Sequence, residues 1–103
     1  MFIAMNRFKV VKGYEDEFVE IWKNRDRRLK ELDGFVSFAM LRGAEHDEYT
    51  LFASHTTWES EAHFTAWTES EQFRTAHKKA EQHSVKYMGP PKFEGFTVIL
   101  EEN

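Results

Sequence analysis

Residues 58–78 read Trp-Glu-Ser-Glu-Ala-His-Phe-Thr-Ala-Trp-Thr-Glu-Ser-Glu-Gln-Phe-Arg-Thr-Ala-His-Lys. This pattern predicts the end of a strand followed by two short helices, with a break near residues 68–70. Ser60 is placed to cap the first helix, because a serine hydroxyl there accepts a hydrogen bond from a free backbone N–H. Thr68 and Glu71 have the spacing of a capping box at the start of the second helix.

Helical spacing places an aromatic pair on one face of the first helix and a Phe–His pair on one face of the second. Phe64 and Trp67 are three residues apart, and Phe73 and His77 are four apart, so each pair shares a face. Trp67 can be a core residue, and His77 can be a surface residue beside Lys78. Alternatively, Trp67 and His77 face a common binding space, with His77 as a metal ligand or general base.

The rest of the chain alternates between strand and helix patterns. The predicted elements are strands over 2–11, 35–42, 49–58 and 93–101, a helix over 14–32, the helix pair, and a loop over 82–92. This order is that of a split βαβ, ferredoxin-like α+β fold. Right-handed crossovers would place the helices on one face of a four-stranded antiparallel sheet.

One polar residue interrupts the apolar, helix-facing side of the first strand. That side carries Phe2, Ala4, Asn6, Phe8 and Val10. A buried amide without a hydrogen bond costs about 1–3 kcal/mol. Asn6 is therefore expected either to bond a neighbouring backbone group or to donate to a ligand between sheet and helices.

The opposite side of the sheet is predicted to be apolar as well. In the second strand, alternation places Phe35, Ala39 and Leu41 on one side and Val36, Phe38 and Met40 on the other. A sheet with helices on only one face normally alternates apolar with polar residues. The bare face therefore needs a cover, and a second copy of the chain is the simplest one. We expect a homodimer whose two sheets form an α+β barrel.

Composition excludes several classes of function. The chain of 103 residues is expected to form one domain, residues 1–103. A net charge of −4 argues against a nucleic-acid partner, and the absence of Cys excludes a thiolate site. No apolar run approaches the length of a membrane span, so a cytoplasmic protein is expected.

Two residues of the 14–32 helix are further candidates for a binding site. Trp22 is expected to be a core residue that can also contact a ligand. Arg25 lies along the apolar stripe, where it can extend its charge to solvent or pair with a ligand carboxylate. Residue spacing alone does not identify that ligand.

Several motifs resemble the IsdG-type haem-degrading monooxygenases of the antibiotic-biosynthesis-monooxygenase superfamily, over nearly the whole chain. The matching segments are Ala4-Met-Asn-Arg7, Lys12-Gly13, Leu32-Asp-Gly-Phe35 and the 58–78 stretch. The Trp58 to Phe64 portion is common to the superfamily. The combination of Asn6, Trp67 and His77 is specific for the haem-degrading branch.

The resemblance implies a role for each of these residues. His77 would be the axial ligand of the haem iron, and Asn6 would hydrogen-bond oxygen held on the opposite side. Trp67 would press on the porphyrin and distort it. The remaining haem contacts would come from Phe64, Phe73, Trp22 and Arg25.

The implied reaction opens haem to a biliverdin-like tetrapyrrole and releases iron. It consumes O₂ and takes electrons from an external reductase or ascorbate, because no flavin or nicotinamide motif is present. The alternatives are a cofactor-independent monooxygenase of quinols or aromatic polyketides, a non-enzymatic haem carrier, and a dimeric binding module without haem.

Overall fold

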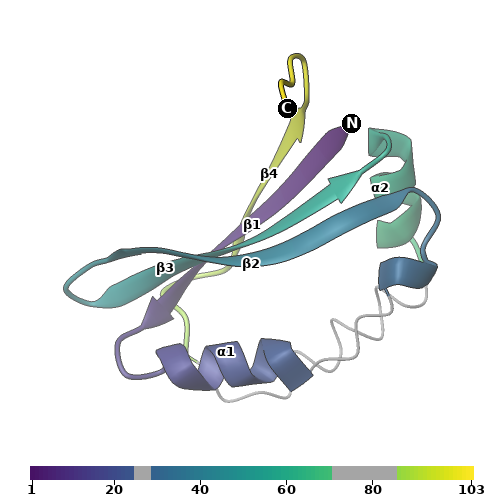
Figure 1. The fold of residues 1–103 in the computed structure, drawn as a ribbon. Coiled ribbons are helices and arrows are strands. Elements are labelled where there is room, and N and C mark those ends of the chain that lie inside the picture. The colour runs from purple at the N-terminus through teal and green to yellow at the C-terminus, as the bar shows by residue number, and fades with distance from the viewer. Residues whose placement is uncertain (25–28, 71–85) are drawn as a thin grey trace.

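The computed structural model describes residues 1–24, 29–70 and 86–103 of the chain (Figure 1). The elements are β1 (Phe2–Val11), α1 (Glu15–Asn24), the 3₁₀ turn η1 (Leu29–Glu31), β2 (Phe35–Glu45), β3 (Tyr49–Trp58), α2 (Glu61–Thr68) and β4 (Lys92–Thr97). No helix within these ranges is long and apolar enough to cross a membrane.

The four strands form one antiparallel sheet in the order β2-β3-β1-β4 (Figure 1). β1 is therefore a central strand, paired with β3 along its whole length and with β4 over Phe2–Arg7. This topology confirms the predicted ferredoxin-like α+β fold.

Three element boundaries differ from those predicted. α1 ends at Asn24, and the later turn of the predicted 14–32 helix is the 3₁₀ segment η1. β2 extends to Glu45, which shortens the predicted hairpin loop. β4 ends at Thr97 rather than at residue 101, and the next residue, Val98, donates a backbone hydrogen bond to Met1 O.

A bulge at the start of β2 overturns the predicted sides of two residues. Phe35 lies opposite Trp58, but Ser37, not Val36, lies opposite Thr57. The extra residue shifts the alternation. Phe35 therefore packs in the helix-side core rather than on the side of Ala39 and Leu41.

Two buried clusters form the core on the helix side of the sheet. Under α1, the first contains Val10, Phe18 and Phe52 and is flanked by Phe8, Trp22 and Met40 among others. Near α2, the second contains Phe2, Ala4 and Trp58 and is flanked by Leu32, Phe35, Phe64 and Trp67. Both clusters use the same alternating residues of β1, so both helices lie on one side of the sheet, as predicted.

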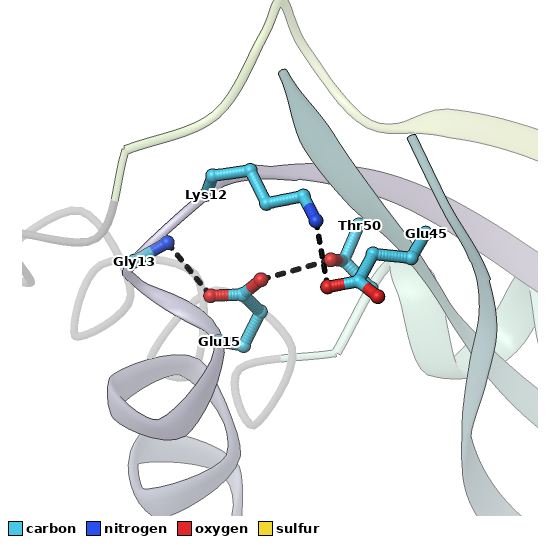
Figure 2. A network of polar contacts seen from close by, with 5 residues as sticks. All are labelled: Lys12, Gly13, Glu15, Glu45 and Thr50. Carbon is cyan, nitrogen blue, oxygen red and sulfur yellow. Dashed lines mark hydrogen bonds and ion pairs between the residues drawn. The ribbon is translucent and has the colours of Figure 1, made fainter. Parts of the chain in front are cut away.

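A polar network fixes the start of α1 to the sheet (Figure 2). Glu15 Oε1 accepts a hydrogen bond from Gly13 N at 2.7 Å, and Glu15 Oε2 accepts one from Thr50 Oγ1 at 2.9 Å. Lys12 Nζ pairs with Glu45 Oε1 at 2.6 Å beside them. Gly13 has φ +95°, a conformation that glycine adopts without strain.

Hydrogen bonds to the ionised form lower the pKa of Glu15 below its ordinary value. The donors are its own backbone N–H, the Thr50 hydroxyl and the Gly13 N–H. A carboxylate with a lowered pKa in the folded state stabilises the fold above the ordinary glutamate pKa. That contribution is lost as the pH falls through the lowered value.

We therefore expect Glu15→Gln to lower the urea midpoint at neutral pH. The difference in urea midpoint between Glu15→Gln and wild type should shrink at a pH below the pKa of Glu15 in the folded protein. There the wild-type carboxyl is protonated and, like the glutamine side chain, uncharged. Glu17→Gln, an exposed change in the same helical turn, is the control and should move the midpoint little. Equal effects of the two changes would contradict the role of Glu15.

Candidate functional site

The first turn of α2 is fixed by contacts made by Ser60 and His63. Ser60 caps the helix, as predicted, by accepting a hydrogen bond from His63 N at 3.2 Å. Its hydroxyl also lies 2.7 Å from His63 Nδ1. The His63 ring occupies the space beside Gly34, which has φ +81°. Gly34 O in turn accepts a hydrogen bond from Glu59 N at 2.8 Å.

This anchoring places the two aromatic residues of α2 against the sheet. Phe64 and Trp67 both pack on the second cluster, which confirms that they share a face. The Trp67 ring lies 5.5 Å from that of Trp58, which is fully buried. Phe64 stacks on Phe93 of β4 at 5.4 Å with nearly parallel rings.

Trp22 projects from α1 toward the sheet. Its ring stacks on that of Phe38 at 5.9 Å and lies 6.0 Å from that of Phe8. It is half-buried at the margin of the first cluster. Trp22 therefore belongs to the margin of the first cluster, as expected of a core residue.

A polar pair lies across the sheet between the two clusters. Asn6 of β1 lies opposite Ser54 of β3, and residues directly opposite in an antiparallel pair point to the same side. Ser54 lies opposite Met40 of β2, and Asn6 lies opposite Phe93 of β4. The row runs Met40, Ser54, Asn6, Phe93 on the helix side.

The Asn6 side chain is half-buried on the helix-facing side, as predicted. One of the two expectations from the sequence was that this amide forms a hydrogen bond with a neighbouring backbone group. In the described part of the chain, its amide makes no hydrogen bond to another residue. The amide is therefore available to a ligand on this side of the sheet.

A pocket of about 310 Å³ opens beside this row, between α1 and β2. Its walls are mainly apolar and aromatic, and two cations are among its lining residues. The lining consists of Val19, Trp22, Lys23, Phe38, Met40, Leu41, Arg42 and Phe52. The Arg42 guanidinium lies 5.5 Å from the centre of the Phe52 ring.

Three predicted site residues lie outside the described residues, namely Arg25, Phe73 and His77. The other four lie on the helix side of the sheet, with Trp22 at the first cluster and Phe64 and Trp67 at the second. Asn6 comes from β1, Trp22 from α1, and Phe64 and Trp67 from α2.

Ser54 and the neighbouring residues of the same row were not predicted from the sequence. The inward side of β3 carries three hydroxyl residues, Thr50, Ser54 and Thr56, so the strand pattern does not distinguish Ser54 from the other two. Finding it required the register of the β1–β3 pair, since only the register places the two polar groups opposite each other.

Comparison with known proteins identifies the family. The model of the antibiotic biosynthesis monooxygenase family matches residues 1–79. The chain belongs to this family. The match supports monooxygenase chemistry and confirms the superfamily predicted from the sequence.

Relatives within the antibiotic biosynthesis monooxygenase family include haem-degrading proteins. The chain is 29 % identical over 84 residues to a staphylobilin-producing haem oxygenase from Staphylococcus haemolyticus, covering 82 % of this chain and 80 % of that protein. This likeness agrees with the predicted resemblance to the IsdG-type branch.

Two solved structures share the fold over the full chain. One is MhuD, a haem degrader from Mycobacterium tuberculosis with two haems in its active site, which aligns with a TM-score of 0.74 and 23 % identity over 100 % of both chains. The other is a MhuD variant with two manganese protoporphyrin IX molecules per active site, with a TM-score of 0.80 and 23 % identity. It covers 100 % of this chain and 99 % of that chain.

Because Gly34 and His63 together set the position of α2, we expect Gly34→Ala to be more destabilising than Gly13→Ala. Both changes place alanine at positive φ, which costs roughly 1–2 kcal/mol. A Cβ at position 34 would also overlap the His63 ring, whereas a Cβ at position 13 meets nothing within 4 Å.

The comparison is made by urea unfolding of both variants in the wild-type and His63→Ala backgrounds. The extra penalty of Gly34→Ala over Gly13→Ala should become smaller in the His63→Ala background, because the ring atoms are removed and only the Cβ at position 63 remains, 2.6 Å from the added Cβ. An extra penalty of the same size in both backgrounds would contradict the contribution of the ring.

Proposed function

We propose that this protein is a haem-degrading monooxygenase. It would open the porphyrin with O₂ and external electrons to a biliverdin-like product and free iron. The observation that carries the proposal is the Asn6 amide, which has no hydrogen-bond partner in the described chain and lies between two aromatic clusters. A relative at 29 % identity, the staphylobilin-producing haem oxygenase from Staphylococcus haemolyticus, supports haem degradation.

The described residues fit a flat aromatic ligand with carboxylates. Trp22 and Trp67 supply large rings on either side of the row that contains Asn6. Lys23 and Arg42, in the adjoining pocket, are cations suited to the two propionate groups of haem. Haem and O₂ supply the oxidising chemistry, and the protein supplies binding and orientation.

Each proposed residue has a separate task. Asn6 donates a hydrogen bond that orients oxygen near the ring, which is a positioning effect. Trp67 presses on the ring face, supported from behind by Trp58. His77 is proposed as the iron ligand on the resemblance alone. Arg25 is proposed as a propionate partner because its sequence position lies along the apolar stripe of the predicted 14–32 helix. Phe64 and Phe73 are proposed as apolar contacts.

A hemin titration followed by addition of ascorbate under air tests this function. The wild-type protein should develop a Soret band that saturates at a stoichiometric ratio of hemin to protein. Ascorbate should then bleach this band. Asn6→Ala should keep the band and lose most of the bleaching, because only the oxygen contact is removed. His77→Ala should abolish bleaching.

The same titration separates the alternatives. A band that forms without O₂-dependent loss would indicate a haem carrier. Absence of a band, together with oxidation of a quinol by the metal-free protein, would indicate the cofactor-independent monooxygenase. Normal bleaching by Asn6→Ala would remove the proposed role of that amide.

We also propose that the protein forms a homodimer through the bare face of the sheet. Phe96 and Leu41 point to that face and are 44 % and 41 % exposed. Phe96 lies opposite Ile3 of β1, which is half-buried, and Leu41 lies opposite Ala53 of β3. Apolar surface of this kind favours association with an identical face across a two-fold axis.

A pair of substitutions on β4 tests the dimer by sedimentation velocity. Phe96→Asp introduces charge on the bare face and should yield monomers. Phe93→Asp makes the same change on the helix side of the same strand, and that variant should remain dimeric. A monomeric wild type, or equal dissociation in both variants, would contradict this interface.

A further inference from the structure

Three hydroxyl side chains are buried on the inward face of β3. Thr50, Ser54 and Thr56 are 0 %, 6 % and 9 % exposed. Two of them have structural partners. Thr50 Oγ1 donates to Glu15 Oε2 at 2.9 Å, and Thr56 Oγ1 donates to Ala4 O at 3.2 Å.

Ser54 differs from both neighbours. Within residues 1–24, 29–70 and 86–103, its hydroxyl makes no hydrogen bond to another side chain or to the backbone. Among the described residues, Trp58 Nε1 is the buried side-chain polar atom without a partner, so the Ser54 oxygen is still reached by solvent. A hydroxyl that solvent reaches on the helix side, and that no protein group binds, is open to a ligand.

The position of Ser54 indicates what it binds. It lies directly opposite Asn6, whose amide also has no partner in the described chain. The Cβ atoms of such a pair are about 4.5–5.5 Å apart, so a single small polar atom can contact both groups. The row is apolar on either side of the pair, at Met40 and Phe93.

We infer that Ser54 is a second hydrogen-bonding residue of the site, and that Ser54 and Asn6 together bind one oxygen atom of a small ligand on the haem. This inference rests on the proposed function and extends it. The amide supplies donors only through its nitrogen, whereas the hydroxyl can donate or accept. The pair can therefore orient both a proton-accepting and a proton-donating oxygen.

The experiment compares Ser54→Ala with Thr56→Val, which removes a partnered hydroxyl two residues along the same face. In the haem-free protein, urea unfolding should show an unchanged or higher midpoint for Ser54→Ala. The midpoint for Thr56→Val should be lower, because the change removes the hydrogen bond that Thr56 Oγ1 donates to Ala4 O. A lower midpoint for Ser54→Ala, similar to that of Thr56→Val, would show a structural hydroxyl and overturn the inference.

The second readout is the C–O stretching frequency of carbon monoxide on the ferrous haem complex, which falls when a donor contacts the ligand oxygen. Ser54→Ala should raise this frequency and slow ascorbate-driven bleaching by about fivefold, the effect of one ordinary hydrogen bond. Thr56→Val should leave the frequency unchanged.

The outcomes separate this inference from the proposed function. If wild type forms no Soret band with hemin, the proposed function fails, and the inference fails with it. If wild type binds and bleaches haem but Ser54→Ala leaves the frequency and the rate unchanged, the inference alone is overturned.

Discussion

The structure depends on an interruption in the apolar surface of its central strand. β1 must present apolar side chains to both helices, and it does so at each end, through Phe2 and Ala4 and through Phe8 and Val10. Asn6 lies in the middle, opposite Ser54. The interruption divides the helix-side core into two clusters and leaves polar groups between them. Without it, one continuous core would cover the sheet.

Each helix is anchored near its own N-terminus, so the central row is not needed to hold either one. Glu15 fixes α1 through Gly13 and Thr50 (Figure 2). Ser60 and His63 fix α2 beside Gly34. This arrangement allows the residues between the clusters to be selected for binding rather than for stability. The missing hydrogen bonds of Asn6 and Ser54 are consistent with that division.

The sequence predicted the four-stranded antiparallel sheet and the side on which Asn6 lies, because β1 alternates regularly and pairs without a bulge. It did not predict the bulge near Phe35, since a register shift depends on the fit of two strands. The end of β4 was likewise set by its partner, which begins at Phe2. Ser54 became a candidate only when the register placed it opposite Asn6. The role of His77 as iron ligand still rests on resemblance alone, and those of Phe73 and Arg25 remain predictions from the sequence.

The central claim is that the Asn6–Ser54 row on the helix side of the sheet binds a porphyrin. Its most direct test is a ¹H–¹⁵N NMR titration with gallium protoporphyrin IX, a diamagnetic analogue of haem. The account predicts that the indole N–H signals of Trp22 and Trp67 and the side-chain amide of Asn6 shift on binding. Shifts confined to the opposite face, at Ile3, Met5 and Phe96, would contradict it.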